Sequence, residues 1–359
     1  MKAAVISLGS KSSQMVIEEM KKYFDQVDDI NLKDIEVSLG DKDIEVLYKN
    51  DPLDHYDCIY AKGSFRYANV LRTITEARFK KSYMPLSPIA FTVGHDKLLS
   101  HIAMHHSKIP MPRTFIASSL ESAKQILEKI NYPIVMKFPQ GTQGKGVMFA
   151  DTFASASSIL DALSALKQPF LIQEYVETGG TDIRAIVVGD RVASAMIRTG
   201  SPRESRSNLH SGGIGKATVL DYRTAKIAVE TAKSINASVC GIDILESPKG
   251  PLVVEVNLSP GLQGITATTN ENVAGKIAKF LAENTKKFLD KGNEAKASKI
   301  FNEVGLSKKG GEQQIITNID FRANRLLLPK VITDISGFDE KDEFVIKTSK
   351  GKIEIEKFG

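Results

Sequence analysis

The chain has little cysteine, no tryptophan and no long hydrophobic run. Of its 359 residues only Cys58 and Cys240 are cysteines, and they lie far apart in the sequence. A disulfide framework and a paired-cysteine metal site are therefore excluded, which is typical of a reducing cytoplasm. No stretch reaches the roughly 18 apolar residues needed to cross a bilayer, and the apolar run after Met1 is too short for a signal peptide. We expect a cytoplasmic protein without a membrane span.

A strong excess of charge of one sign is also absent. Lys and Arg number 48 against 43 Asp and Glu, which leaves a formal net charge of +5. An excess this small favours anionic small ligands without requiring nucleic acid. With 42% hydrophobic and 25% charged residues, the composition is globular and excludes a collagen-like or disordered chain. At about 150 residues per domain, the length predicts two or three domains.

Short apolar strands alternate with helical stretches in residues 1–92. A buried strand is predicted at 3–8, a helical stretch follows it, and a second apolar run lies at 58–61. This alternation predicts a small parallel α/β domain with functional groups at its strand ends. Pro85 and Pro88 mark a link to the next domain, because residues before proline avoid the helical conformation.

Residues 93–288 are expected to form a larger α+β domain. A helix is predicted at 121–130, with Ser118 in the position of a capping box. The pair at 189–190 predicts a hairpin turn, and a final helix is expected at 273–288. Runs rich in Val and Ile predict strands at 134–138, 170–175, 183–188, 192–197, 242–245 and 252–256.

The last part of the chain changes character twice. Residues 289–311 are rich in Lys, Asn, Ser and Gly, which is typical of a linker or a fraying helix. Residues 312–359 are expected to form a small β-rich module with strands near 315–316, 326–328, 344–346 and 353–355. The predicted fold class is α/β plus α+β, followed by this module.

A glycine-rich hairpin carries the strongest local signal. A predicted strand ends at Lys137, and Gly141, Gly144 and Gly146 follow. Glycines let backbone N–H groups approach phosphate oxygens closely, and a lysine supplies positive charge. The spacing matches neither common glycine-rich phosphate motif. Taken alone, the segment is as compatible with a bland turn as with a phosphate-binding flap.

An acid and amide group lies on two later strands. Glu255 and Asn257 are two residues apart and share one face of a strand, and Asp243 lies in the apolar run before them. Hard oxygen ligands on one face suit Mg²⁺, which prefers one or two carboxylates together with substrate phosphates. A solvent-facing polar strand has the same pattern, so both interpretations stay open here.

Taken in order, these motifs resemble those of the ATP-grasp carboxylate–amine ligases. The resemblance is strong over 96–269 and weaker over the N-terminal domain, and the nearest group is RimK-like, whose members add glutamate to a protein or small-molecule carboxylate. The segments that carry it are 96–98, 135–147, 173–176, 182–184, 206–213, 241–245 and 255–262. It implies an ATP-grasp fold preceded by a pre-ATP-grasp domain.

The resemblance also implies a role for each matching residue. Lys97 and Lys137 match the lysines that hold ATP phosphates. Divalent cations, Lys137 and Arg206 would stabilise the transferring phosphoryl group, so these two side chains are the expected catalytic residues. The other matches are Glu174, Tyr175 and Asp182 for ATP, Arg206, Ser207 and Asn208 for the phosphates, Asp243, Glu255 and Asn257 for two Mg²⁺ or Mn²⁺ ions, Arg66, Arg184 and His210 for substrate, and Gly141, Gly144 and Gly146 for the flap.

The implied reaction makes an amide bond through an acyl phosphate. The amine is expected to be L-glutamate, and the acceptor a protein C-terminus or a small-molecule or cofactor carboxylate. The segment 259–264 resembles the glutamate-adding type rather than the lysine-pathway type. A lysine-pathway or glutathione-type ligase stays open, as does a non-catalytic nucleotide-dependent regulator that binds DNA. The intact charges of Lys137, Asp243 and Glu255 argue against that regulator, because they are expensive to keep unless metal is bound.

The tail resembles a different family. Residues 324–344 are similar to the swapped-hairpin fold of AbrB-like proteins, which dimerise and in some cases bind DNA. Many acids accompany the lysines of the tail, which makes nucleic acid a poor partner. We therefore expect a homo-oligomer or substrate docking, with a plain stabilising appendage as the alternative.

Overall fold

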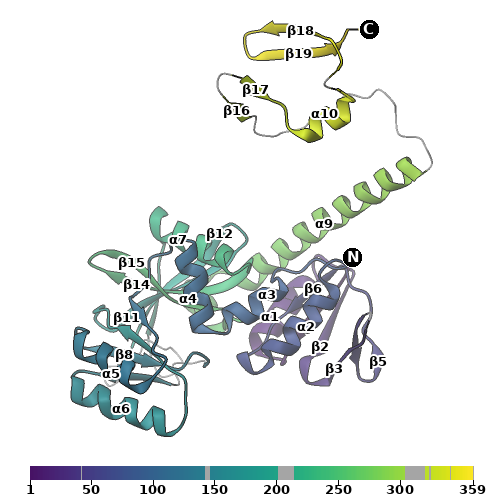
Figure 1. The fold of residues 1–359 in the computed structure, drawn as a ribbon. Helices are drawn as coiled ribbons and strands as arrows, with labels where there is room; N and C mark the ends of the chain where they lie inside the picture. The colour runs from purple at the N-terminus through teal and green to yellow at the C-terminus, as the bar shows by residue number, and fades with distance from the viewer. Residues whose placement is uncertain are drawn as a thin grey trace. The chain divides into compact units, whose positions relative to one another are not determined.

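The computed structural model describes residues 1–41, 43–141, 146–200, 214–303, 320–322, 325–339 and 341–358. The chain divides into two compact units, Met1–Lys296 and Ala297–Gly359. Figure 1 follows the helices and strands of both units along the chain. Within the described ranges, no helix combines the length and the apolar character that crossing a membrane requires.

The first unit begins with a parallel sheet, the N-terminal sheet, in the order β2-β1-β6. Its strands β1 and β6 are apolar and buried, as expected when both faces of a parallel sheet are covered. Helix α1 packs on this sheet, and α2 contacts an adjoining antiparallel sheet β3-β4-β5. The elements are β1 (Lys2–Ser7), α1 (Lys11–Met20), β2 (Gln26–Asn31), η1 (Leu32–Asp34), β3 (Ile35–Leu39), β4 (Ile44–Tyr48), β5 (Asp51–Pro52), β6 (Cys58–Ala61), η2 (Phe65–Tyr67) and α2 (Ala68–Arg78).

A second sheet, the small sheet, has the order β7-β10-β8-β9 and a hydrophobic core of its own with α5 and α6. Both helices lie on the same side of it (Figure 1). Ser119, not Ser118 as predicted, caps α5: the helix begins at Leu120, one residue before the predicted start, and the Ser119 hydroxyl accepts from the Ser122 amide. The elements are α3 (Pro88–Gly94), α4 (Lys97–His106), β7 (Thr114–Phe115), α5 (Leu120–Lys129), β8 (Ile134–Lys137), β9 (Val147–Ala150), α6 (Phe153–Ala165) and β10 (Leu171–Glu174).

A third sheet, the large sheet, is antiparallel in the order β13-β12-β11-β14-β15. Apolar residues of α7 and α9 pack on it, and its core is continuous with that of the N-terminal sheet. These two sheets are therefore held together by one core, whereas the small sheet has a separate one. The elements are β11 (Thr181–Val188), β12 (Arg191–Thr199), β13 (Ile214–Ala217), α7 (Tyr222–Ser234), β14 (Val239–Ser247), β15 (Gly250–Asn257), α8 (Gln263–Thr269) and α9 (Val273–Glu303).

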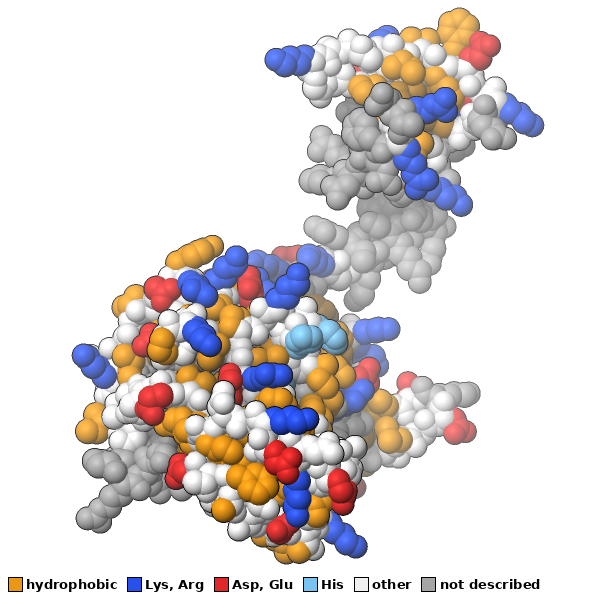
Figure 2. Space-filling model, turned by 60° about the vertical axis from the view of Figure 1, so that its left-hand side comes forward, with side chains coloured by type: hydrophobic (Ala, Val, Ile, Leu, Met, Phe, Trp, Pro, Cys, Tyr) orange, Lys and Arg blue, Asp and Glu red, His pale blue; other side chains and the backbone are white. Residues whose placement is uncertain are grey.

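Among its described residues, the second unit has the antiparallel strand pairs β16-β17 and β18-β19 and a helix, α10, that the sequence did not predict. Large apolar side chains stay exposed on its strands, among them Ile346 and Ile353, and Figure 2 shows hydrophobic side chains on its surface. On the first unit the same view shows acidic and basic side chains interspersed, in keeping with the small net charge. The elements are β16 (Asp320–Arg322), β17 (Arg325–Leu327), α10 (Lys330–Ser336), β18 (Phe344–Ser349) and β19 (Lys352–Lys357).

Candidate active site

A cavity of about 740 Å³ is lined by residues of all three main sheets of the first unit and the loops that follow their strands. Most of the candidate residues predicted from the sequence line it together. They are Lys97, Lys137, Gly141, Glu174, Tyr175, Asp182, Arg184, Asp243, Glu255 and Asn257. Segments that lie more than a hundred residues apart in the sequence thus contribute to one site.

Two acidic side chains of the cavity, Asp243 and Glu255, lie in one row across the large sheet. In the antiparallel ladders, Arg184 of β11 pairs with Asp243 of β14, which in turn pairs with Glu255 of β15. Directly opposed residues of neighbouring strands point to the same face. Asn257 lies two residues beyond Glu255, so it shares that face and lies opposite Gly241. Strand register therefore gathers two acids, one amide and one arginine.

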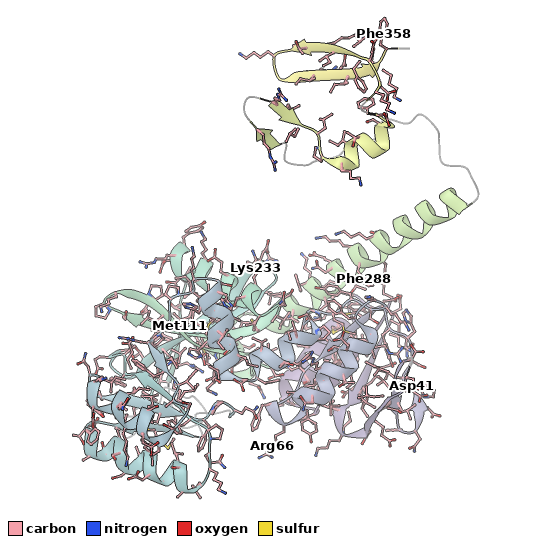
Figure 3. The ribbon with its side chains drawn as sticks, viewed as in Figure 1. Asp41, Arg66, Met111, Lys233, Phe288 and Phe358 are labelled. Atoms are coloured by element: carbon pink, nitrogen blue, oxygen red, sulfur yellow. The ribbon has the colours of Figure 1, made fainter. Side chains whose placement is uncertain are left out.

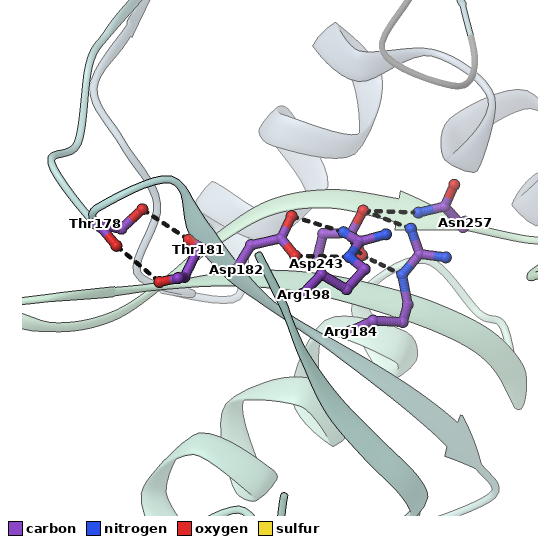
Figure 4. A network of polar contacts seen from close by, with 7 residues as sticks. All are labelled: Thr178, Thr181, Asp182, Arg184, Arg198, Asp243 and Asn257. Carbon is purple, nitrogen blue, oxygen red and sulfur yellow. Dashed lines mark hydrogen bonds and ion pairs between the residues drawn. The ribbon is translucent and has the colours of Figure 1, made fainter. Parts of the chain in front are cut away.

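Asp243 lies at the centre of a charge network (Figure 4). Its carboxylate accepts hydrogen bonds from Nε and Nη2 of Arg184, the latter at 2.8 Å, and lies 3.1 Å from Nη2 of Arg198. Burial alone would raise the pKa of Asp243, but the charges of Arg184 and Arg198 outweigh it and lower the pKa below its ordinary value. The carboxylate is therefore ionised at neutral pH. Arg184, expected at a substrate carboxylate, is here the bidentate partner of Asp243.

Asp182 and Arg198 form the second half of this network. Arg198 donates from Nε and Nη2 to the two oxygens of Asp182 at 2.6 and 2.7 Å, a bidentate pair across β11 and β12. Burial opposes the charge of Arg198, but Asp243 and Asp182 raise its pKa above the ordinary value. Arg198 thus connects the expected ATP contact with the expected metal ligand.

Lys137 is held by an amide rather than by an acid. Its Nζ donates to Oε1 of Gln173 at 2.6 Å, and the Gln173 amide nitrogen donates to Oγ1 of Thr114 at 2.8 Å and lies 3.2 Å from Nε2 of His101. Burial lowers the pKa of Lys137 to about 8, which the charge of Glu255 partly opposes. A buried ammonium with so little compensation is suited to an anionic ligand such as phosphate.

Lys97 begins α4 and connects it to the glycine-rich segment. Asp96 caps the helix, and the Lys97 amide donates to the carbonyl of Pro139 at 2.9 Å. The Lys97 Nζ donates to the carbonyl of Gly141 at 3.1 Å and lies 3.5 Å from Oε1 of Glu255. Lys97 therefore lies between the expected flap and the expected metal ligands.

Gly146 is the first residue of the flap that the structure describes after Gly141, and its surroundings leave no room for a side chain. It has φ +80°, and a Cβ built on it would lie 2.2 Å from Cδ2 of Phe138. Any other residue would therefore be strained and would displace the Phe138 ring. Gly146 does not line the cavity; it keeps β8 and β9 close where the flap leaves the small sheet.

The nucleotide end of the cavity is apolar with a polar hinge. Val135, Val147 and Phe149 line it beside Tyr175, and the Phe149 and Tyr175 rings meet edge to face at 6.0 Å. Oε1 of Glu174 accepts from the Arg113 amide at 2.8 Å, which fixes the chain after β10. An apolar slot between two sheets with backbone groups at its edge fits an adenine ring.

The donor set of the acidic row fits a hard divalent cation. Asp243 and Glu255 offer carboxylate oxygens, and the Asn257 amide nitrogen lies 3.3 Å from Oδ2 of Asp243, so Oδ1 of Asn257 remains an acceptor. The ranges that the structure describes contain no cluster of three or more His, Cys, Asp or Glu residues around a metal position. Two acids and an amide suit a Mg²⁺ that takes its other ligands from phosphate and water.

Of the predicted residues that the structure describes, Arg66 and Gly146 do not line the cavity. Arg66 is exposed in η2 (Figure 3) and is not among the lining residues. Gly144, Arg206, Ser207, Asn208 and His210 lie outside the described residues.

Sequence reasoning missed three side chains that the structure places in the site. Arg198, Gln173 and Lys62 all line the cavity. Each has a feature that the sequence shows: a long polar side chain ends, interrupts or follows an apolar strand. A polar side chain that is buried at such a position needs a hydrogen-bond or charge partner. The partners themselves come from other strands and are not visible in local sequence.

The fold and the cavity define the class of the protein. Two sheets, each from its own subdomain, hold an apolar slot, two lysines and an acidic row between them. A family model described as a RimK-like ATP-grasp domain matches residues 94–281. The chain belongs to the RimK-like ATP-grasp family and is an ATP-dependent ligase.

Curated relatives and solved structures agree with this assignment. A "Probable alpha-L-glutamate ligase" of Vibrio cholerae serotype O1 is 36% identical over 292 residues, covering 79% of this chain and 96% of the relative. The corresponding protein of Cellvibrio japonicus is 32% identical, covering 80% of this chain and 97% of that relative.

Solved structures show the same fold. A RimK domain ATP-grasp protein of Sphaerobacter thermophilus has TM-score 0.62 at 18% identity, covering 78% of this chain and 99% of its own. The ATP-grasp ligase PsnB, solved with a minimal precursor, Mg and ADP, has TM-score 0.62 at 16% identity, covering 79% of this chain and 98% of its own. The predicted ATP-grasp fold is confirmed, whereas an AbrB-like tail is not.

Proposed function

We propose that this ligase joins the amine of L-glutamate to a carboxylate of an acceptor, either a protein C-terminus or a small-molecule or cofactor carboxylate. The observation that carries the proposal is the single cavity in which Asp243, Glu255 and Asn257 share lining with Lys97 and Lys137. The names of the relatives support glutamate as the amine. A lysine-pathway or glutathione-type ligase remains the alternative within the class.

The chemistry is an acyl transfer through phosphate. An acceptor carboxylate oxygen attacks the γ-phosphorus of ATP, and ADP leaves. The glutamate amine then attacks the acyl carbon, phosphate leaves with the former carboxylate oxygen, and the amine gives up a proton. Lys97 and Lys137 hold the phosphates, and Arg206 with Ser207 and Asn208 contacts them and the acyl phosphate. Bound at Asp243, Glu255 and Asn257, two Mg²⁺ or Mn²⁺ ions would neutralise phosphate charge.

The reaction is tested with purified protein, ATP, Mg²⁺, L-glutamate and a panel of acceptors that includes peptides with free C-termini. We expect ADP and phosphate to form only when both co-substrates are present, with a product heavier by one glutamyl unit. An ¹⁸O label in the acceptor carboxylate should appear in the released phosphate. Formation of AMP and pyrophosphate, or turnover without acceptor, would contradict the acyl phosphate.

The metal assignment is tested by Glu255→Gln. This change keeps the shape of the side chain and weakens one ligand, so we expect turnover to fall at least about 100-fold and the Mg²⁺ requirement to rise. Glu246→Gln is the matched control, because Glu246 lies on β14, is exposed and does not line the cavity. Wild-type turnover of Glu255→Gln would refute the assignment.

The acceptor class has one further pointer. The structural neighbour PsnB was also solved with a precursor peptide, and so was the macrocyclase MdnC, which has TM-score 0.58. These two complexes support a peptide acceptor over a small molecule. Peptides ending in a free carboxylate, compared with the same peptides ending in an amide, test this choice by mass spectrometry.

The second unit is proposed as a pairing module of a homo-oligomer in the cytoplasm. Its exposed apolar residues Leu327, Ile346 and Ile353, at 41, 60 and 54% exposure, support an AbrB-like contact between copies. The proposed domains are 1–92, 93–288 and 312–359, with 289–311 as the linker. Truncation after Lys309 should lower the number of protomers per particle, which is the mass from light scattering divided by the mass of the shortened chain. An unchanged number of protomers would contradict a pairing role for the module.

A further inference from the structure

Lys62 lies at the carboxyl edge of the N-terminal sheet, directly after β6. Its amide donates to the carbonyl of Ile6 at 2.9 Å, which fixes the residue beside the end of β1. Its side chain lines the cavity and is only 4% exposed. The carboxyl edge of a parallel sheet is where ligands bind in α/β folds.

The ammonium group of Lys62 is left without an anion. No oxygen of the described residues accepts a hydrogen bond from its Nζ or forms an ion pair with it, and its recorded contact is the Tyr60 ring at 5.6 Å from the centroid. Burial lowers the pKa of Lys62 to about 8. The other cationic groups that line the described cavity are all engaged: Lys97 with Gly141 and Glu255, Lys137 with Gln173, Arg184 with Asp243, and Arg198 with Asp182 and Asp243.

The start of α1 adds two free donors to the same part of the cavity. Ser10 caps the helix and accepts from the Ser13 amide, whereas the amides of Lys11 and Ser12 have no acceptor among the described residues. Ser10, Ser12 and Ser13 line the cavity together with Lys62. The first turn of a helix favours an anion through these amides and the helix dipole.

The start of α1, beside Lys62, is fixed in place relative to the large sheet that carries Asp243 and Glu255. The Ser12 hydroxyl donates to Oε1 of Gln263 at 2.7 Å and accepts from the Leu262 amide at 2.8 Å, which ties α1 to the start of α8. The N-terminal sheet and the large sheet also share one hydrophobic core. A substrate held at Lys62 would therefore be held at a set distance from Asp243 and Glu255.

We propose that Lys62 and the free amides of α1 bind a substrate carboxylate that is not the one activated by ATP. This inference rests on the proposed function, in which glutamate reacts only through its amine and keeps both carboxylates. The bound group belongs either to the amino acid or to a second carboxylate of the acceptor, and both have the same chemistry. Lys62 is thus a substrate-binding residue that lines the cavity from the N-terminal sheet, whereas residues of the small sheet line the nucleotide slot.

Steady-state kinetics of Lys62→Met in the full chain test the assignment. The variant keeps the apolar stem and removes the charge, so we expect the KM of one co-substrate to rise about 10- to 100-fold, the loss of one charged hydrogen bond. A rise for L-glutamate assigns the subsite to the amino acid, and a rise for the acceptor assigns it to the acceptor. The KM of ATP should stay within about twofold. Lys62→Arg should restore part of the affinity, and Lys33→Met, at an exposed lysine of the same domain, should change nothing.

A binding measurement separates this inference from the proposed function. L-glutamate and a di-glutamate peptide are titrated into wild type and Lys62→Met in the presence of ADP and Mg²⁺, with calorimetry as the readout. Weaker binding to the variant supports the subsite even if no ligase turnover is found. Equal binding to both proteins, no carboxylate binding to wild type, or an unchanged KM for both co-substrates overturns it, even if the ligase reaction is confirmed.

Discussion

The charged side chains of the cavity are paired on the large sheet and unpaired at the edge of the N-terminal sheet. On the large sheet, Asp182, Arg198, Asp243 and Arg184 satisfy one another in a continuous network. At the edge of the N-terminal sheet, Lys62 is buried with no anion among the described residues. In the first arrangement each charge has an oppositely charged partner within the protein, whereas in the second the lysine gains one only when a ligand binds.

Paired charges hold side chains in position, whereas an unpaired charge is available to bind a ligand. A paired network holds its members in one geometry, and breaking it leaves a buried charge uncompensated. An unpaired buried charge lowers stability in the free protein, and a ligand that compensates it gains affinity. The predictions below test this contrast, beginning with the largest expected effect.

Asp243→Asn should disrupt the network of paired charges on the large sheet. The change leaves Arg184 without its carboxylate and Arg198 with Asp182 alone, in side chains that are 9 to 14% exposed. We expect the free energy of unfolding to fall by about 3–5 kcal/mol and turnover to be lost. Denaturant unfolding of the purified variant checks the stability.

Glu255→Gln is the comparison for that measurement. Glu255 has a side chain that is 31% exposed and one ion pair, to Lys97 at 3.5 Å. Such a pair contributes only about 0–1 kcal/mol, so this variant should lose turnover with little loss of stability. If Asp243→Asn were no less stable than Glu255→Gln, the network would not hold the sheet face together.

The same network shows which parts of the fold and the site could be predicted from the sequence. The hairpin turn at 189–190, the strand runs and the acid–amide spacing were readable locally, and they predicted most strands of the large sheet. Arg198 was not identified, because a bulge between Ile186 and Val187 shifts the ladder by one residue. Without the bulge Asp182 would lie opposite Ile197; with it, Asp182 lies opposite Arg198. Register shifts of this kind are set by packing and are not visible in a local pattern.

Lys62 was missed for a different reason. The apolar run that it follows was recognised, but nothing local indicates that a lysine after a strand remains buried. Lys62 lines the cavity together with the start of α1 and with residues 260–263, which follow β15 more than 190 residues away in the chain. Three-dimensional packing, not composition, distinguishes it from the many exposed lysines.

Lys62→Met should stabilise the free protein. The pKa of Lys62 is about 8 in the folded state against an ordinary value of 10.5. Below pH 8 the lysine is protonated in both states and its burial is fully unfavourable; between pH 8 and 10.5 the folded state releases the proton first, so wild type gains stability as pH rises. We expect the variant to be more stable by up to ~3 kcal/mol at neutral pH.

The pH dependence is the decisive part of that prediction. The advantage of Lys62→Met should shrink between neutral pH and pH 10.5, which urea unfolding at several pH values can follow. Lys33→Met, at an exposed lysine, should show no such trend. A loss of stability in Lys62→Met at neutral pH would mean that the lysine has a structural partner.

Gly146→Ala tests the boundary of the flap. A left-handed φ of +80° and a Cβ 2.2 Å from Phe138 both oppose a side chain there. We expect about 1–2 kcal/mol of lost stability and a raised KM for ATP, because Lys137 lies on the strand that leads into the flap. Gly337→Ala is the control, since Gly337 has a similar φ of +63° with nothing near its Cβ. Equal losses in both variants would assign the effect to φ alone.

Ser12→Ala should give the smallest loss of stability. Ser12 connects α1 of the N-terminal domain to the start of α8, so the variant tests both regions of the cavity. The change leaves the buried amide of Leu262 without its acceptor and Gln263 without a donor, at a cost of about 1 kcal/mol. If α1 and the large sheet position one substrate together, the KM raised by Lys62→Met should rise a few-fold here too. The double variant should then show less than the sum of the two free-energy changes, because both act on one bound carboxylate. Ser38→Ala, an exposed serine of the same domain, provides the baseline. Strict additivity would mean that Lys62 and the start of α1 bind separate groups, which would divide the proposed subsite in two.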